Sequence, residues 1–217
     1  MRVTIVGGHG QIAQLLTRLL VSRGDEVVGI IRNPAQSEEL RDLGAEPLVL
    51  DLEATTLPEA ATALAGSDAV VFAAGAGPGS GIERKYTVDQ GAADLSAAAA
   101  QAAGVSRFLQ ISSMGTDQPP QDDDVFSHYL RAKAAAEQFL RDTDLDYLIV
   151  RPGRLTDEPA TGHVALAHQV PRSSVPRADV AAVLVALLEQ PTLRRETLEL
   201  VSGDDPIAAA VAHLSEH

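Results

Sequence analysis

The chain of 217 residues contains no cysteine, and only 3% of its residues are aromatic. Without cysteine, disulfide bonds and thiol nucleophiles are excluded, while a reducing compartment is permitted. Because aromatic side chains are so few, the hydrophobic share of 45% consists mainly of alanine, valine, leucine and isoleucine. Such side chains suit helices that pack closely on a buried β-sheet.

Basic residues are also scarce, since 17 lysines and arginines face 30 acidic residues and leave a net charge of −13. An acidic surface repels phosphate backbones and anionic lipid, so we expect neither nucleic acid nor a membrane as a partner. Only five residues separate Met1 from the first glycine, too few for the apolar core of a secretory signal. We expect a cytoplasmic protein, monomeric or homodimeric, that acts on a small-molecule substrate.

Short apolar runs rich in β-branched residues alternate with helical patterns along the chain. We predict strands at 2–6, 26–31, 46–50, 68–74, 107–112, 146–150 and 197–201. We predict helices at 11–24, 37–43, 57–65, 87–103, 126–142 and 178–189, and a last one after 201. Strands that are apolar throughout are typical of a parallel sheet covered on both faces, and right-handed crossovers then give a doubly wound α/β sheet, the Rossmann fold.

We expect residues 1–217 to form one NAD(P)-binding domain. Its least regular stretch is 152–177, which is rich in proline and glycine and follows the sixth strand. Ligands of such sheets bind at the carboxyl ends of the strands, so this stretch is expected to line the substrate.

The turn between the first strand and the first helix carries the residues expected at a pyrophosphate: Gly7, His9, Gly10, Gln11 and Ile12. Gly7 permits a tight turn, Gly10 lets a phosphate approach the backbone, and Ala13 is small enough for the helix to lie near the strand. Free N–H groups at the start of the helix then face the anion. We interpret His9 as a loop residue of this turn and not as a catalyst.

The ends of the next three strands indicate how the rest of a dinucleotide is held. Arg32, with Asn33 beside it, stands where an NAD site usually has an acidic residue, and a guanidinium suits a 2′-phosphate. This favours NADP, unless Arg32 is only a solvated charge at a strand end. Asp51, followed by Leu52, either accepts a hydrogen bond from the adenine amino group or caps the next turn. Small residues leave room for the adenosine ribose after the fourth strand, at Ala73, Ala74 and Gly75.

A tyrosine and a lysine four residues apart, Tyr129 and Lys133, share one face of the helix predicted at 126–142. The lysine is informative because the chain has only two lysines against fifteen arginines. A nearby ammonium favours the phenolate and lowers the pKa of tyrosine, which can then exchange a proton with a carbonyl substrate. Ser112 or Ser113, after the fifth strand, would polarise that carbonyl. The alternative is an ordinary helix face with serines that start a turn.

Together with the segment "RPGRL" at 151–155, these motifs resemble the short-chain dehydrogenase/reductase superfamily. The nearest likeness is to its atypical branch of NAD(P)H-binding proteins, often labelled NAD-dependent epimerase/dehydratases. The resemblance implies NADP in the cleft, with Ser113 as polarising hydroxyl, Tyr129 as acid–base and Lys133 as its tuner and a cofactor contact. Ser112, Pro152 and Gly153 would also contact the cofactor. The substrate region is too short for the sugar-nucleotide lobe of true epimerases.

Two functions follow from this resemblance. The first is an NADP-dependent oxidoreductase that transfers hydride between nicotinamide and a small carbonyl or alcohol. The second is a regulatory protein that senses NADP(H) without turnover. We expect no metal site, because no second pair of ligand residues stands at metal-binding spacing.

Overall fold

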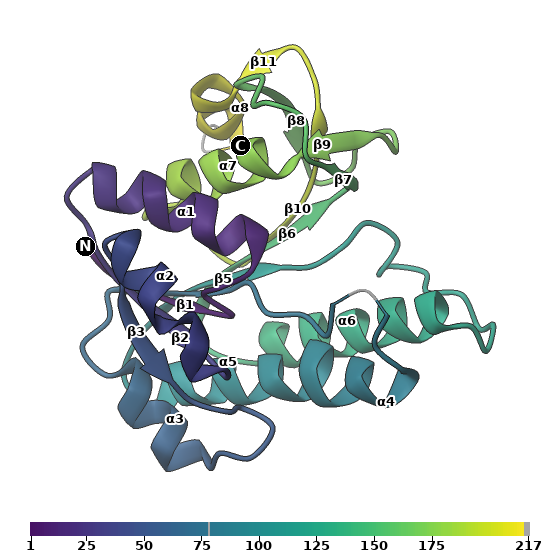
Figure 1. Cartoon of the computed structure of the whole chain (residues 1–217). Helices are drawn as coiled ribbons and strands as arrows, with labels where there is room; N and C mark the ends of the chain where they lie inside the picture. Colours follow the sequence, from purple (N-terminus) through teal and green to yellow (C-terminus); the bar gives the residue numbers. More distant parts are fainter. Residues whose placement is uncertain (78, 215–217) are drawn as a thin grey trace.

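A nine-stranded sheet forms the centre of the protein, as seen in a computed structural model that describes residues 1–77 and 79–214 (Figure 1). Seven of its strands are mutually parallel. In spatial order these strands are β3 (Glu46–Val49), β2 (Glu26–Ile31), β1 (Arg2–Val6), β4 (Ala69–Phe72), β5 (Arg107–Ile111), β6 (Asp146–Pro152) and β10 (Glu196–Ser202). The predicted Rossmann-type sheet is thus confirmed for this part of the fold.

Helices cover both faces of the sheet, as expected for strands without polar alternation (Figure 1). One face carries α1 (Gln11–Ser22), α2 (Ser37–Asp42), α7 (Arg177–Leu188) and α8 (Ile207–Leu214). The other carries α3 (Leu57–Leu64), α5 (Ala93–Ala102) and α6 (Val125–Arg141). Alternate residues of one strand serve the two cores: Val71 of β4 packs with the first group, whereas Val70 and Phe72 pack with the second.

The segment 152–177 is more regular than the sequence suggested. It contains β7 (Arg154–Thr156) and β9 (Ser174–Pro176), which pair in a small parallel sheet, and β8 (His163–Ala167). Strand β8 joins the main sheet antiparallel to β10, and β11 (Asp205–Pro206) pairs antiparallel with β8. The expectation of a wholly parallel sheet is therefore wrong at this edge. The signal was weak because these strands are only two to five residues long and lie among prolines and glycines.

The helix expected at 87–103 is interrupted. A short α4 (Ile82–Arg84) leads into a π-helix, η2 (Lys85–Ala92), and only then into α5. Wide turns of this kind are rare and occur frequently at functional sites. In this case both Lys85 and Asp89 are buried, with exposed fractions of 7% and 1%. Segment η2 thus brings two opposite charges into the interior, next to α6.

None of the helices within the described ranges combines the length and the apolar character that crossing a membrane requires.

Candidate functional site

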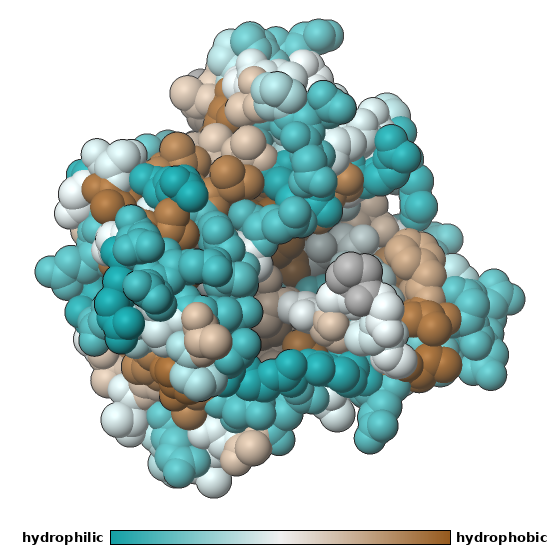
Figure 2. Space-filling view, in the orientation of Figure 1, coloured by the Kyte–Doolittle hydropathy of each residue, from teal (hydrophilic) through white to brown (hydrophobic). Residues whose placement is uncertain are grey.

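A cavity of about 430 Å³ lies at the carboxyl ends of β1 to β4, where the face seen in Figure 2 is hollowed. Nine of the residues predicted for the cofactor line it: Gly7, His9, Gly10, Arg32, Asn33, Asp51, Leu52, Ala74 and Gly75. Gln11 and Ile12 form the first turn of α1 beside this cavity, and Ala73 directly follows β4. The structure thus gathers at one edge of the sheet residues that are spread over positions 7–75 of the sequence.

The glycine turn fits a pyrophosphate because its backbone is closely packed and its helix end is free. Gly7 has φ +82°, and a Cβ added there would lie 2.6 Å from Cα of Ala74. Gly10 is the N-cap of α1 and offers no side chain to its first N–H groups. These donors, together with the positive end of the helix dipole, are suited to an anion.

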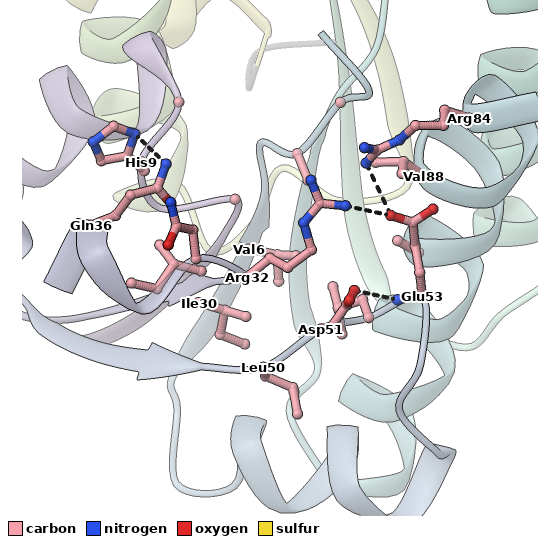
Figure 3. A pocket seen from close by; sticks show the side chains of 18 residues that line it. Val6, His9, Ile30, Arg32, Gln36, Leu50, Asp51, Glu53, Arg84 and Val88 are labelled. Atoms are coloured by element: carbon pink, nitrogen blue, oxygen red, sulfur yellow. Dashed lines mark hydrogen bonds and ion pairs between the residues drawn. The ribbon is translucent and has the colours of Figure 1, made fainter. Parts of the chain in front are cut away.

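Arg32 is not an isolated surface charge. Its Nη1 lies 2.8 Å from Oε2 of Glu53, which also receives Nη2 of Arg84 at 3.0 Å (Figure 3). Thr87 donates to the other carboxylate oxygen at 2.6 Å. Two guanidinium groups thus share one carboxylate at the rim of the cavity, and Asp51, which also lines it, supplies a second negative charge. Sequence reasoning missed Glu53 and Arg84 because neither belongs to the glycine motif or follows β2.

Asp51 and His9 have local partners. Oδ1 of Asp51 accepts a hydrogen bond from the backbone N–H of Glu53 at 3.0 Å, so Asp51 caps the turn, as one of the two alternatives proposed; the adenine contact stays a prediction. The His9 ring lies 2.6 Å from a carboxylate oxygen of Glu39. It also lies 3.0 Å from the amide nitrogen of Gln36 (Figure 3). His9 therefore ties the glycine turn to α2.

A second cavity, of about 710 Å³, lies beyond the ends of β5 and β6. Ser113, Tyr129, Pro152 and Gly153 line it. The ring of Tyr129 stacks on that of Phe126, with centroids 5.9 Å apart and planes inclined by 27°. Two of the three predicted reaction groups, Ser113 and Tyr129, therefore face a space large enough for a small organic ligand.

Lys133 is buried behind Tyr129 and lines neither cavity. Its Nζ donates to the carbonyl of Ile111 at 3.1 Å and lies 3.7 Å from Oδ1 of Asp89. Burial lowers the pKa of Lys133, and the charge of Asp89 opposes that shift. The structure therefore pairs the predicted tuning cation with a carboxylate that the sequence pattern did not reveal.

The expectation that Lys133 lowers the pKa of Tyr129 is wrong for this arrangement. Burial raises the pKa of Tyr129 to about 12, the charge of Asp89 raises it further, and only the Ser113 hydroxyl opposes the shift. Burial is the larger of the two causes, and Asp89, which adds to it, lies 3.7 Å from the ammonium of Lys133. Lys85 of η2 also lies over the Tyr129 ring, 5.6 Å from its centroid.

The two serines after β5 have different surroundings. Ser112 donates to Oε1 of Glu137 at 2.6 Å in the interior, contrary to its expected role as a cofactor contact. Consecutive residues of an extended chain point to opposite sides, and it is Ser113 that lines the second cavity. Of the two candidates for the polarising hydroxyl, only Ser113 is therefore suitably placed.

The buried carboxylate of Glu137 links two segments that the sequence singled out, namely 151–155 and the helix that carries Tyr129 and Lys133. Arg151 binds its carboxylate with two hydrogen bonds of 2.9 and 2.6 Å, and Arg141 adds a third at 2.8 Å. Burial alone would raise the pKa of Glu137, but the bonds from Arg151 and Ser112 lower it. The pair fastens α6, which carries Tyr129 and Lys133, to strand β6.

Comparison with known proteins agrees with this geometry. The family described as NAD(P)H-binding matches residues 7–191. A Bacillus subtilis protein named "uncharacterized sugar epimerase YhfK" is 34% identical over 99% of this chain and all of its own length.

Two solved structures are also similar. One, from Bacillus halodurans, is provisionally named an NAD-dependent epimerase/dehydratase; it has 39% identity and a TM-score of 0.91, covering 98% of this chain and 99% of its own. The oxidoreductase YlbE of Lactococcus lactis has 28% identity and a TM-score of 0.88, covering 100% and 98%. This chain therefore belongs to the NAD(P)H-binding family, in the branch whose members are named epimerase/dehydratases and oxidoreductases.

Proposed function

We propose that this protein is an NADP-dependent oxidoreductase of the short-chain dehydrogenase/reductase type, acting on a small carbonyl or alcohol in the cytoplasm. One observation carries the proposal: the buried carboxylate of Asp89 lies between Gly75, which lines the first cavity, and Lys133, which lies next to Tyr129 of the second. Its Oδ1 lies 3.7 Å from Nζ of Lys133, behind Tyr129, and close to Gly75, where an added Cβ would lie 3.1 Å away. The phenol and the glycine turn thus belong to one continuous edge of the sheet.

Each residue has a role in this proposal. NADPH, when bound, supplies the hydride. The N–H groups of Gln11 and Ile12 hold the pyrophosphate, and the Ser113 hydroxyl donates to the substrate carbonyl oxygen. Tyr129 gives its proton to the same oxygen and takes it back in the reverse direction. In this proposal residues 1–217 act as one domain, and residues 152–177 line the substrate.

The preference for NADP is supported by the pair of guanidinium groups at Glu53. Arg32 and Arg84 are held at the cavity rim by a shared carboxylate, and both side chains line the first cavity. A 2′-phosphate accepts bidentate bonds from arginine, whereas a 2′-hydroxyl of NAD gains little from two cations. Asn33 adds polar side-chain atoms beside them.

The experiment is a titration of the wild type and Tyr129→Phe with NADPH and NADH, followed by a panel of aldehydes and ketones. We expect tighter binding of NADPH by both proteins and loss of turnover by about 10²–10⁴-fold in the variant alone. Tighter binding of NADH would contradict the preference for NADP. Undiminished turnover by Tyr129→Phe would contradict the role of the phenol.

A second function, sensing of NADP(H) without turnover, is favoured by one specific observation. The pKa of Tyr129 is raised to about 12, and Lys133 is paired with Asp89, so the phenol is held in its neutral form. A phenol with so high a pKa gives up its proton less readily than an ordinary tyrosine, but it still donates a hydrogen bond to an acceptor. Binding of NADPH with no turnover of any carbonyl in the panel would support this function over the first.

A further inference from the structure

The second cavity is basic although the protein carries a net charge of −13. Among the described residues that line it are three arginines, Arg154, Arg172 and Arg177, and no acidic residue. Two of the surrounding elements, β7 and β9, are the strands that the sequence did not predict. Cations gathered in a hollow of an acidic protein attract anions to that hollow selectively.

Two of these arginines are available for a ligand. Within residues 1–77 and 79–214, no carboxylate lies within 4 Å of Arg154 or Arg172, whereas Arg177 pairs with the exposed Asp157 at 2.7 Å. Arg172 lies over Gly115: a Cβ added there would be 2.7 Å from its Nη2. Gly115 is two residues beyond Ser113, so this guanidinium lies on the loop that carries the proposed polarising hydroxyl.

Another part of the cavity wall is apolar. Phe126 has an exposed fraction of 58% and stacks on Tyr129, and Met114 and Leu155 add aliphatic surface. An exposed aromatic ring next to the reaction group is unusual in a chain with only seven phenylalanines and tyrosines in total. A flat ligand body can cover the ring while its charged end reaches the guanidinium groups.

We propose that the substrate is a carbonyl compound that carries a carboxylate on a flat, apolar body. Arg172 and Arg154 bind the carboxylate, and Phe126 contacts the body, which directs the carbonyl toward Tyr129 and Ser113. The planar fork of arginine matches the two oxygens of a carboxylate. This inference rests on the proposed reductase function for the carbonyl, but the anion site is a separate property of the cavity.

The kinetic test uses two aldehydes that differ in charge, 4-carboxybenzaldehyde and methyl 4-formylbenzoate, each with NADPH. We expect the wild type to reduce the acid with a kcat/KM at least tenfold above that of the ester. Arg172→Gln should lower the value for the acid about tenfold and leave the ester unchanged. Arg18→Gln, which changes an exposed arginine of α1, should alter neither. Equal rates for both aldehydes in the wild type would overturn the inference.

A binding test separates this inference from the proposed function. Benzoate and benzamide have similar shapes but differ in charge, and neither contains a ketone or aldehyde that hydride could reduce. Calorimetry with protein saturated with NADP⁺ therefore measures the anion site alone. Benzoate bound at least tenfold more tightly than benzamide, with the difference lost in Arg172→Gln and reduced by salt, supports the site even if no aldehyde is turned over. Benzoate binding without any turnover would contradict only the proposed reductase function and would leave the anion site supported.

Three results would overturn the inference. Benzoate bound no more tightly than benzamide, while the aldehydes are reduced, would leave the reductase function without an anion site. Absence of benzoate binding at all would exclude the site directly. Benzoate binding that is lost in Arg32→Gln and kept in Arg172→Gln would place the anion in the other cavity.

Discussion

The two halves of the cleft owe their geometry to different parts of the chain, one to the backbone and the other to buried charged side chains. At the glycine turn the geometry comes from the backbone: a positive φ at Gly7, close contact with Ala74, and the open end of α1. At the reaction end it comes from buried charges, since Lys133, Asp89 and Glu137 all have exposed fractions of 4% or less. A backbone site depends little on pH, whereas a site of buried charges depends on every neighbouring ionisable group.

The difference determines how each half responds to substitution. A side chain added at the glycine turn meets closely packed backbone atoms at or just beyond the ends of strands, which have little freedom to move. A charge removed at the reaction end leaves its partner buried without compensation, and the pKa values around it change. The four predictions below test this contrast, from the largest expected effect to the smallest.

Gly7→Ala should have the largest effect on the backbone-built half. The new Cβ would lie 2.6 Å from Cα of Ala74, at a residue with φ +82°. Gly66→Ala is the matched control, because Gly66 has φ +77° and nothing within 4 Å of an added Cβ. We expect Gly7→Ala to lose NADPH affinity more than a hundredfold in a fluorescence titration. The control should lose about 1–2 kcal/mol of stability and no affinity. Equal losses of affinity would contradict the contact with Ala74 as the cause.

Glu137→Gln should have the next largest effect, on the half built from charges. It leaves Arg151 buried without its partner, so we expect the free energy of unfolding to fall by about 3–5 kcal/mol in a urea titration. Glu26→Gln breaks an exposed pair with Arg2 and should cost less than about 1 kcal/mol.

The difference in unfolding free energy between the wild type and Glu137→Gln should shrink as the pH falls. The folded protein lowers the pKa of Glu137 below its ordinary 4.5, so the carboxylate stabilises the folded state above that pH. As the pH falls below 4.5 through the lowered pKa, the wild type loses this advantage and its stability approaches that of Glu137→Gln. A gap that widens in acid would contradict the ion pair with Arg151.

The same contrast explains what the sequence could predict. The glycine turn, Arg32 and the seven parallel strands follow from local patterns, and the structure places them as expected. Asp89, Glu53 and Arg84 could not be found in this way, because their importance depends on partners 21 to 44 positions away. The burial of Asp89 also depends on the π-helix Lys85–Ala92, for which its sequence KYTVDQGA gives no signal.

Arg32→Gln and Arg84→Gln test the cofactor preference and should have intermediate effects. Each removes one of the two cations that share Glu53, so we expect NADPH affinity to fall about tenfold and NADH affinity to stay the same. Glu53→Gln removes the competing carboxylate and should raise NADPH affinity. Arg41→Gln, an exposed arginine of α2, serves as control. A loss of NADH affinity equal to that of NADPH would show that the two arginines do not recognise the 2′-phosphate.

Asp89→Asn should have the smallest effect, on the titration of Tyr129. The substitution removes a negative charge next to Lys133 and Tyr129, while the amide oxygen can still accept the bond from the N–H of Ala76. The groups that then face the phenol are Lys133 on its own helix, Lys85 of η2 and Ser113 after β5.

Two causes raise the pKa of Tyr129 to about 12, and only the lesser one is removed by Asp89→Asn. We therefore expect the pKa to fall but to stay above its ordinary value near 10, because burial remains. The chain has no tryptophan and three tyrosines, so ultraviolet absorbance resolves the titration once Tyr129→Phe is subtracted. Asp94→Asn, which removes a half-buried carboxylate of α5, should leave it unchanged. An unchanged pKa of Tyr129 in Asp89→Asn would mean that Lys133 loses its proton when the charge of Asp89 is removed. The buried, neutral amine would then exert no electrostatic field on the phenol.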